Sequence, residues 1–146
     1  MEYDKRGRQL DQRHRRLATG GTGSHDFGML WSMITVPTEQ FEELVTQSLA
    51  AIPERLRSNM DNVAVMVDDF SPPGTLLGLY EGVPLTRRGN GYAASVPDRI
   101  TIYMATICRS CSTIEELAAM VRKTVIHEVG HHFGIDDHRL EELGWA

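Results

Sequence analysis

Cysteine is scarce in this sequence, and long hydrophobic runs and low-complexity tracts are missing. Two cysteines in 146 residues exclude the disulfide framework on which small secreted scaffolds depend. No apolar stretch approaches the roughly 18 residues that cross a bilayer, and the first residues lack the apolar segment of a secretory signal. With 13 glycines and 6 prolines, the composition is not that of a collagen-like chain. We therefore expect a cytoplasmic protein that has no membrane partner.

The rest of the composition is typical of one ordinary globular domain. Hydrophobic residues make up 41% and charged residues 24%, and a chain of this length buries roughly two-thirds of its unfolded surface. The net charge is −5, but residues 1–17 carry six basic and three acidic side chains, which leaves −8 on the remainder. We predict a basic, glycine-rich arm over residues 1–28 and one domain over residues 29–146. Only the arm has the charge to contact nucleic acid.

Apolar residues at helical spacing predict two main helices. The first covers residues 38–51 and is capped by Thr38, with its apolar stripe formed by Phe41, Leu44, Val45, Ser48, Leu49 and Ile52. The second is long and begins at one of two overlapping capping boxes, which start at Ser112 and Thr113. Gly134 is suited to end it, because glycine readily adopts the left-handed backbone found after many helices.

Three β-prone runs lie between the two helices. They cover residues 63–67, 75–80 and 99–107, and turn-forming residues bound them. The run over 63–67 (VAVMV) is apolar on both faces, which predicts a central strand. Strands flanked by a helix on each side, without repeats, indicate an α+β fold.

The histidines are clustered. Four of the six lie within twelve residues, in the segment HEVGHHFGIDDH from His127 to His138. On a helix, His127 and His131 are about 40° apart around the axis and about 6 Å apart along it, so both imidazoles can reach one zinc ion. Glu128 projects from the adjacent face and can reach a water molecule at the metal, which is the position of a general base. An HExxH string followed by glycine three residues later arises by chance in only about 0.2% of chains with this composition.

A catalytic zinc ion usually has three protein ligands and one open position. A tight turn at Gly134 would bring Asp137, six residues after His131, best into place for the third ligand. His138 is its main competitor, and Asp136 and a distant carboxylate compete as well. We expect His132, about 100° from His131, to pack in the core or to donate a hydrogen bond to a ligand.

Cys108 and Cys111 offer a rival zinc site. Together with His127 and His131 they match the spacing of a C2H2 zinc finger. If the long helix starts at residue 113, however, His127 lies about 21 Å from the cysteines, too far for bonds near 2 Å. We therefore expect free thiols at the end of a strand.

The segment HEVGHHFGIDDHRLEELGW resembles the active-site signature of the small zincin-like metallopeptidases, or mini-zincins. DNVAVMVDD, LLGLYEGVPLTRR and PDRITIYMATI are also similar to that family's pattern, so that the resemblance covers residues 34–145. It implies a minimal zincin fold with a small mixed sheet, a backing helix and a long C-terminal active-site helix. It also implies zinc bound by His127, His131 and Asp137, with Glu128 as the catalytic base.

One departure from related metallopeptidases concerns the floor of the site. Metzincins place a methionine turn beneath the metal, whereas the last methionine here is Met120, upstream of the histidines. We expect Leu140, Leu143 and Trp145 to fold back and close the site from below.

Together these features predict a zinc-dependent peptidase that acts on a peptide or protein substrate, paired as a strand with a sheet edge. An oxyanion donor is needed as well, and the candidates are Tyr80, Tyr92, Tyr103, Arg87 and Arg88. The alternative is a non-catalytic zinc-binding module, in which the metal only stabilises the C-terminal turn.

Overall fold

The computed structural model describes residues 33–71, 75–92 and 96–145. The predicted arm over residues 1–28 lies outside these described residues. Within them, no helix combines the length and the apolar character that a membrane crossing requires.

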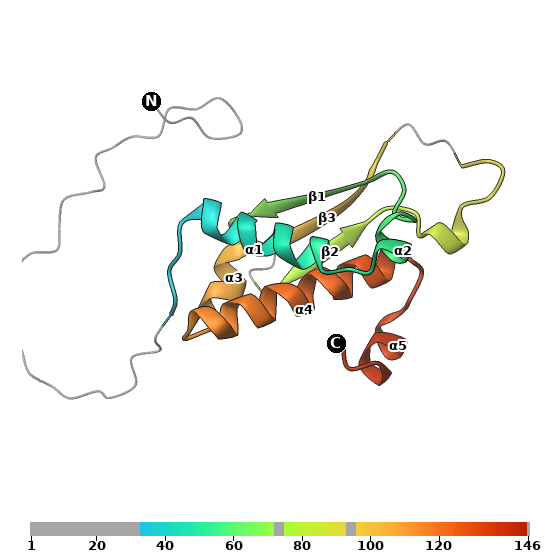
Figure 1. Ribbon diagram of the computed structural model, residues 1–146. Helices are drawn as coiled ribbons and strands as arrows, with labels where there is room; N and C mark the ends of the chain where they lie inside the picture. The colour runs from blue at the N-terminus through green and yellow to red at the C-terminus, as the bar shows by residue number, and fades with distance from the viewer. Residues whose placement is uncertain (1–32, 72–74, 93–95, 146) are drawn as a thin grey trace, which may run out of the picture. The chain divides into compact units, whose positions relative to one another are not determined.

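The described strands form one mixed sheet (Figure 1). Strands β1 (Val63–Asp68), β2 (Gly78–Glu81) and β3 (Asp98–Tyr103) are ordered β1-β3-β2. β1 pairs with β3 in parallel and β2 pairs with β3 in antiparallel orientation. The small mixed sheet of the predicted α+β fold is thus confirmed, and β2 is an edge strand of it.

Two predictions about the strands were wrong. The run over 63–67 is an edge strand rather than the central one, and Ala64 and Met66 on its outer face are exposed. The run over 99–107 is a strand only as far as Tyr103, after which α3 (Met104–Arg109) begins. A short apolar run does not distinguish a buried strand from a buried helix, and here its second half forms a helix.

The two predicted main helices lie side by side over one face of the sheet (Figure 1). They are α1 (Thr38–Ala50) and α4 (Ile114–His132). The predicted cap of α1 was wrong, since Pro37 occupies the N-cap position and no side chain caps it. At α4 the Thr113 hydroxyl accepts a hydrogen bond from the Glu116 N–H at 3.1 Å, whereas the Glu116 carboxylate accepts one from Ser112 N–H at 2.7 Å. The described residues also form three shorter segments: α2 (Glu54–Arg57), the 3₁₀ turn η2 (Leu85–Arg87) and α5 (Asp137–Glu142).

The core fixes the orientation of α4. Leu117, Val121 and Val125 follow one another at four-residue spacing and are fully buried, in a core that also contains Phe41, Ile100, Ile102 and Ile107. Full burial of each such side chain stabilises the fold by about 1.5–3 kcal/mol. Because this stripe faces the sheet and α1, the neighbouring stripe of Lys123, His127 and His131 is turned away from the core.

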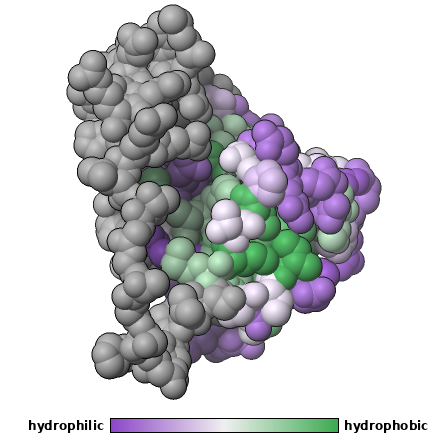
Figure 2. Space-filling model, turned by 90° about the vertical axis from the view of Figure 1, so that its left-hand side faces the viewer, coloured by the Kyte–Doolittle hydropathy of each residue, from purple (hydrophilic) through white to green (hydrophobic). Residues whose placement is uncertain are grey.

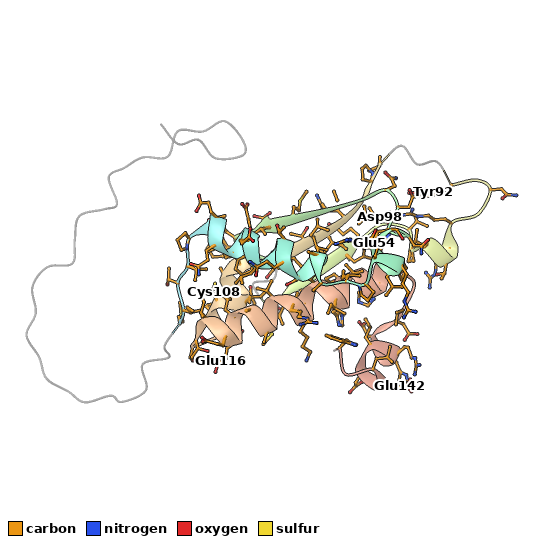
Figure 3. All side chains as sticks on the ribbon, in the orientation of Figure 1. Glu54, Tyr92, Asp98, Cys108, Glu116 and Glu142 are labelled. Atoms are coloured by element: carbon orange, nitrogen blue, oxygen red, sulfur yellow. The ribbon has the colours of Figure 1, made fainter. Side chains whose placement is uncertain are left out.

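Both cysteines are buried far from the histidine-bearing end of α4. Cys108 lies in α3 and Cys111 just after it, so that the predicted place at the end of a strand was wrong. Figure 3 shows Cys108 and Glu116 at one end of the domain and Glu142 at the other. Burial raises the pKa of both thiols, which lowers the fraction of reactive thiolate.

The surface at the cysteine end is partly apolar. Figure 2 views the end of the domain where α4 begins, and apolar side chains gather there among polar ones. Elsewhere in the described chain, charged and polar residues cover most of the outer faces of α1 and α4. The clustered histidines lie at the opposite end of α4.

Candidate metal centre and catalytic groove

Three potential metal ligands converge at the end of α4. The Nε2 atoms of His127 and His131 are 3.1 Å apart, and Asp137 Oδ1 lies 3.3 Å from the first and 3.1 Å from the second. Among the described residues these three form the group of side chains close enough to hold one ion. Neither Cys108 nor Cys111 belongs to it, so the structure does not assemble the C2H2 site.

A tight turn after α4 brings Asp137 back to the histidines. Gly134 has φ +85°, and its N–H donates to the His131 carbonyl at 2.9 Å. The N–H of Ile135 donates to the Gly130 carbonyl, also at 2.9 Å. These two bonds define a Schellman motif, which ends the helix and reverses the chain. Asp137 is the first residue of α5, directly after this turn.

The two neighbours of Asp137 that could replace it as the third ligand have different partners. Asp136 is the N-cap of α5, and its Oδ1 accepts the Arg139 N–H at 2.9 Å. His138 is 81% exposed and lies 3.6 Å from the Glu142 carboxylate. Of these three candidates, the structure therefore groups only Asp137 with the histidines.

The hydrogen bonds of the two histidines fix their tautomers. His127 Nδ1 lies 2.9 Å from the carbonyl of Trp145, and His131 Nδ1 lies 2.9 Å from that of Ile135. Because a carbonyl only accepts, each Nδ1 carries the proton, and in a neutral ring Nε2 then presents a lone pair. When both rings are neutral, two lone pairs and a carboxylate oxygen face one another without a donor between them, which is the donor set of a cation site.

The spacing of these atoms fits zinc. Bonds of about 2.0–2.1 Å at tetrahedral angles place neighbouring ligand atoms about 3.3 Å apart. The three separations of 3.1–3.3 Å match that value. The residues present are therefore able to hold the ion that the zincin-like motif implies.

The C-terminal segment folds back to support His127. Gly144 has φ +78°, and Trp145 N–H donates to the Leu140 carbonyl at 2.8 Å, which again is the pattern of a Schellman motif. Leu140 is buried against Gly130, where an added Cβ would lie 2.7 Å from a Leu140 methyl carbon. The prediction of a fold-back is confirmed for Leu140 and Trp145 and was wrong for Leu143, which is 46% exposed.

Glu128 is buried between α4 and β2. Gly78 of β2 leaves the space, because a Cβ there would lie 2.8 Å from Glu128 Cγ and from a methyl carbon of Thr124. The Tyr80 backbone N–H donates a hydrogen bond to the carboxylate. Burial raises the pKa of Glu128, an effect that the nearby His127 and His131 partly oppose.

A groove of about 790 Å³ runs between α4 and β2 past these residues. His127, Glu128, His131 and Asp137 all line it, together with residues 75–80. The rest of its lining is mostly apolar and includes one further acid, Asp136, and two cations, Arg87 and Lys123.

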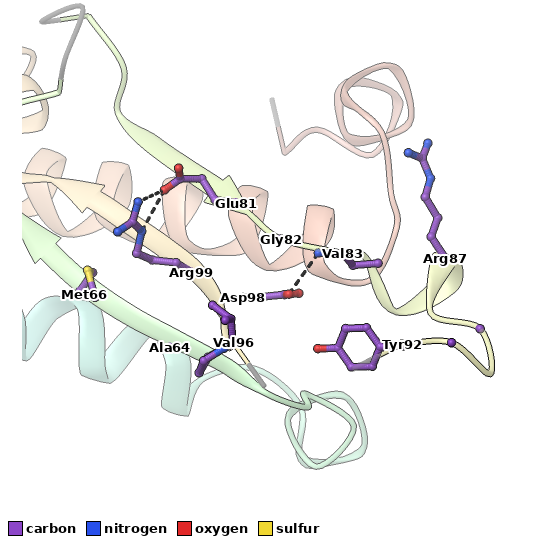
Figure 4. Close-up of a pocket in the computed structure, with 13 residues that line it drawn as sticks. Ala64, Met66, Glu81, Gly82, Val83, Arg87, Tyr92, Val96, Asp98 and Arg99 are labelled. Carbon is purple, nitrogen blue, oxygen red and sulfur yellow. Dashed lines mark hydrogen bonds and ion pairs between the residues drawn. The ribbon is translucent and has the colours of Figure 1, made fainter. Parts of the chain in front are cut away.

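A second polar cluster adjoins the groove at Tyr80. It is centred on Asp98, which is 3% exposed. Its Oδ2 accepts hydrogen bonds from Tyr80 Oη at 2.5 Å, Arg88 at 2.6 Å and His132 Nδ1 at 3.1 Å. Its Oδ1 accepts the Val83 N–H at 3.1 Å (Figure 4). Burial by itself would raise the pKa of Asp98, but these hydrogen bonds outweigh it and hold the pKa below its usual value.

His132 links this cluster to the metal helix. It is fully buried and follows His131 in α4. Its Nε2 accepts the Asp61 N–H at 3.4 Å, so that Nδ1 donates to Asp98. Burial lowers its pKa, which favours the neutral ring. His132 thus lies in the core, as predicted, and contacts Asp98 rather than a ligand.

The five candidates for an oxyanion donor differ in their hydrogen-bond partners and in whether they line the groove. The side chains of Tyr80 and Arg88 are bound to Asp98, and the Tyr92 hydroxyl accepts from Asn62 at 2.9 Å. Tyr103 is buried and does not line the groove. Arg87 does line it, and in Figure 4 its side chain points away from Tyr92 and Asp98.

Sequence reasoning missed Gly78, Asp98 and the two carbonyls that accept from the histidines. A glycine inside a predicted strand indicates a close approach by another segment, so TLLGLY carried a signal for Gly78. Asp98 precedes the predicted strand over 99–107 as a turn residue would, and nothing in its neighbours predicted its burial.

We expect Gly134→Ala to destabilise the protein by more than about 1–2 kcal/mol, the cost of a left-handed backbone for alanine. The added Cβ would also collide with the Thr86 side chain. Urea unfolding is the measurement. Gly144→Ala is the matched control for the backbone effect alone, since its φ is +78° and nothing lies within 4 Å of the added Cβ. Equal losses in both variants would contradict the proposed contact with Thr86.

Comparisons with known proteins show the family of this chain. One solved structure, a conserved hypothetical protein from Thermo thermophilus, matches with 25% identity and a TM-score of 0.48, over 74% of this chain and 97% of that one. No curated protein matches the chain. The sequence pattern of the zincin-like metallopeptidases matches residues 60–145, which include the sheet, α4 and α5. The chain belongs to the family of zincin-like metallopeptidases.

Proposed function

We propose that the protein is a zinc-dependent peptidase with His127, His131 and Asp137 as ligands and Glu128 as the general base. One observation carries the proposal: three possible ligand atoms converge beside a buried glutamate, in a groove lined by β2, an edge strand of the described sheet. Membership of the zincin-like metallopeptidases supports it at the level of the family.

Zinc at this position would supply Lewis acidity, polarising a carbonyl group and easing the deprotonation of water. The carboxylate of Glu128 takes the proton from the attacking water. It then delivers this proton to the amide nitrogen as the carbon–nitrogen bond breaks, so that one new carboxylate and one amine leave. The buried position beside Gly78 keeps the carboxylate oriented, and the Tyr80 N–H holds one of its oxygens.

The edge of β2 offers a place for the substrate. Along one edge β2 pairs with β3, and Gly78, Leu79 and Tyr80 of β2 line the groove. An extended peptide can add to such an edge by main-chain hydrogen bonds. Its scissile carbonyl would then lie between β2 and the end of α4, within reach of Glu128.

The test has two arms on the full chain. We expect protein purified without added metal to contain or take up about one zinc ion per chain, and to cleave members of a fluorogenic peptide library until a chelator is added. His127→Ala and His131→Ala should lose the metal, whereas His138→Ala should keep it. Stoichiometric zinc with no cleavage of any peptide would favour a non-catalytic zinc-binding module instead.

A further inference from the structure

Two cations of the groove have no ion-pair partner among the described residues. Lys123 and Arg87 both line the groove that contains the candidate ligands, and neither takes part in any of the ion pairs found in the described chain. By contrast Arg88, the neighbour of Arg87, is held by Asp98. Unpaired cations beside a mostly apolar groove are suited to bind a carboxylate of the ligand.

Lys123 has a defined position relative to the metal centre. It precedes His127 by one helical step of four residues, so that both lie on one stripe of α4 and about 6 Å apart along its axis. An extended peptide advances about 3.3 Å per residue. Lys123 is therefore level with a substrate position about two residues from the scissile bond.

The contacts of β2 show on which side of the scissile bond this position lies. Gly78 lies against Thr124 and Glu128, and Tyr80, two residues later, packs its ring against His132. β2 therefore runs in the same direction as α4. A peptide added antiparallel to β2, the more common and slightly more stable pairing, runs the opposite way. Its C-terminal part then extends toward Lys123, and its N-terminal part toward Arg87.

We propose that Lys123 binds a carboxylate of the substrate about two residues beyond the scissile bond, on the C-terminal side. This inference rests on the proposed peptidase function and names its substrate class. Two sources supply the same group: the free C-terminus of a short substrate, or the side chain of an acidic residue within a longer one.

The experiment measures binding rather than turnover, on full-length zinc-loaded protein at low ionic strength. The probes are succinyl hydroxamates, which bind an accessible metal through the hydroxamate and extend only along the C-terminal side. One pair ends in glycine with a free carboxylate or an amide. A second pair carries glutamate or glutamine at that position and ends in an amide.

We expect the carboxylate member of at least one pair to bind about fivefold more tightly than its neutral partner, the upper range for an exposed ion pair. The pair that shows the difference identifies the source of the carboxylate. Lys123→Met should remove the preference, and Lys123→Glu should reverse it. Arg122→Met, at an exposed neighbour that does not line the groove, should leave it unchanged.

The same measurements distinguish failure of the Lys123 proposal from failure of the proposed peptidase function. Equal binding of both members of each pair would overturn the role of Lys123. Loss of the preference in Arg87→Met but not in Lys123→Met would overturn the antiparallel orientation and hence the proposal. If no hydroxamate binds although zinc is present, the metal is closed to ligands and the proposed function itself fails.

Discussion

Glu128→Gln is expected to reduce kcat for peptide cleavage by about 10²–10⁴-fold, the usual contribution of a general base. Glutamine has nearly the same shape and fits the space beside Gly78, but its amide cannot take a proton from water. Zinc content should not change, because Glu128 is not one of the three grouped ligands. Peptide hydrolysis and metal analysis on the same preparation check both parts.

A control for this variant is Glu115→Gln. Glu115 is exposed in the first turn of α4, far along the helix from the histidines, and we expect its replacement to leave kcat unchanged. Undiminished turnover in Glu128→Gln would exclude Glu128 as the base. Loss of zinc together with turnover would instead assign it a role in holding the site together.

Asp98→Asn is expected to cost about 3–5 kcal/mol of stability, because it removes one partner of a buried ion pair and leaves the other charge uncompensated. Arg88 lies 2.6 Å from Asp98, and its side chain is only 8% exposed. Asparagine keeps the size of the side chain but offers no charge to Arg88. The free energy of unfolding in urea measures the loss.

Asp61→Asn is the matched control, since Asp61 pairs with the same Arg88 at 3.2 Å but is 74% exposed. An exposed pair of this kind contributes about 0–1 kcal/mol. If the two variants lose similar stability, burial of the Asp98 pair does not determine its contribution. A loss below about 1 kcal/mol in Asp98→Asn would contradict the prediction.

The histidine motif shows how much of the site local sequence can predict. The spacing of His127, Glu128 and His131 on a helix determines their relative positions, because helix geometry is the same in every protein. The turn at Gly134 extends that argument to Asp137, since a Schellman motif is also a local structure. These relations need no information from distant parts of the chain.

The residues that orient the histidines were less predictable, because they lie in distant segments of the chain. The Trp145 carbonyl that orients His127 lies 18 residues away, and Asp98 lies 34 residues before its partner His132. A sequence pattern contains no information on such pairings. The same limit explains the error at residues 99–107, where tertiary packing determined that the run ends in helix α3.

The position of β1 was wrong for a related reason. A continuous apolar run such as VAVMV usually indicates burial on both faces, but among the described residues helices cover only one face of this small sheet. On the other face, Ala64 and Met66 of β1 are exposed. The fold class itself was predictable, since it needs only the order of the elements.

The unequal support of the two histidines has a consequence for the order in which the site assembles. His131 is oriented by Ile135, four residues away in the cap of its own helix, so that it is in place as soon as α4 has formed. His127 depends on Trp145, and Asp137 lies in α5, so both await the docking of the segment after Ile135. A bound metal ion would then hold this segment against α4, because Asp137 and the two histidines would share it as ligands. We expect amide exchange in α5 to slow on metal binding while exchange in the core of α4 hardly changes.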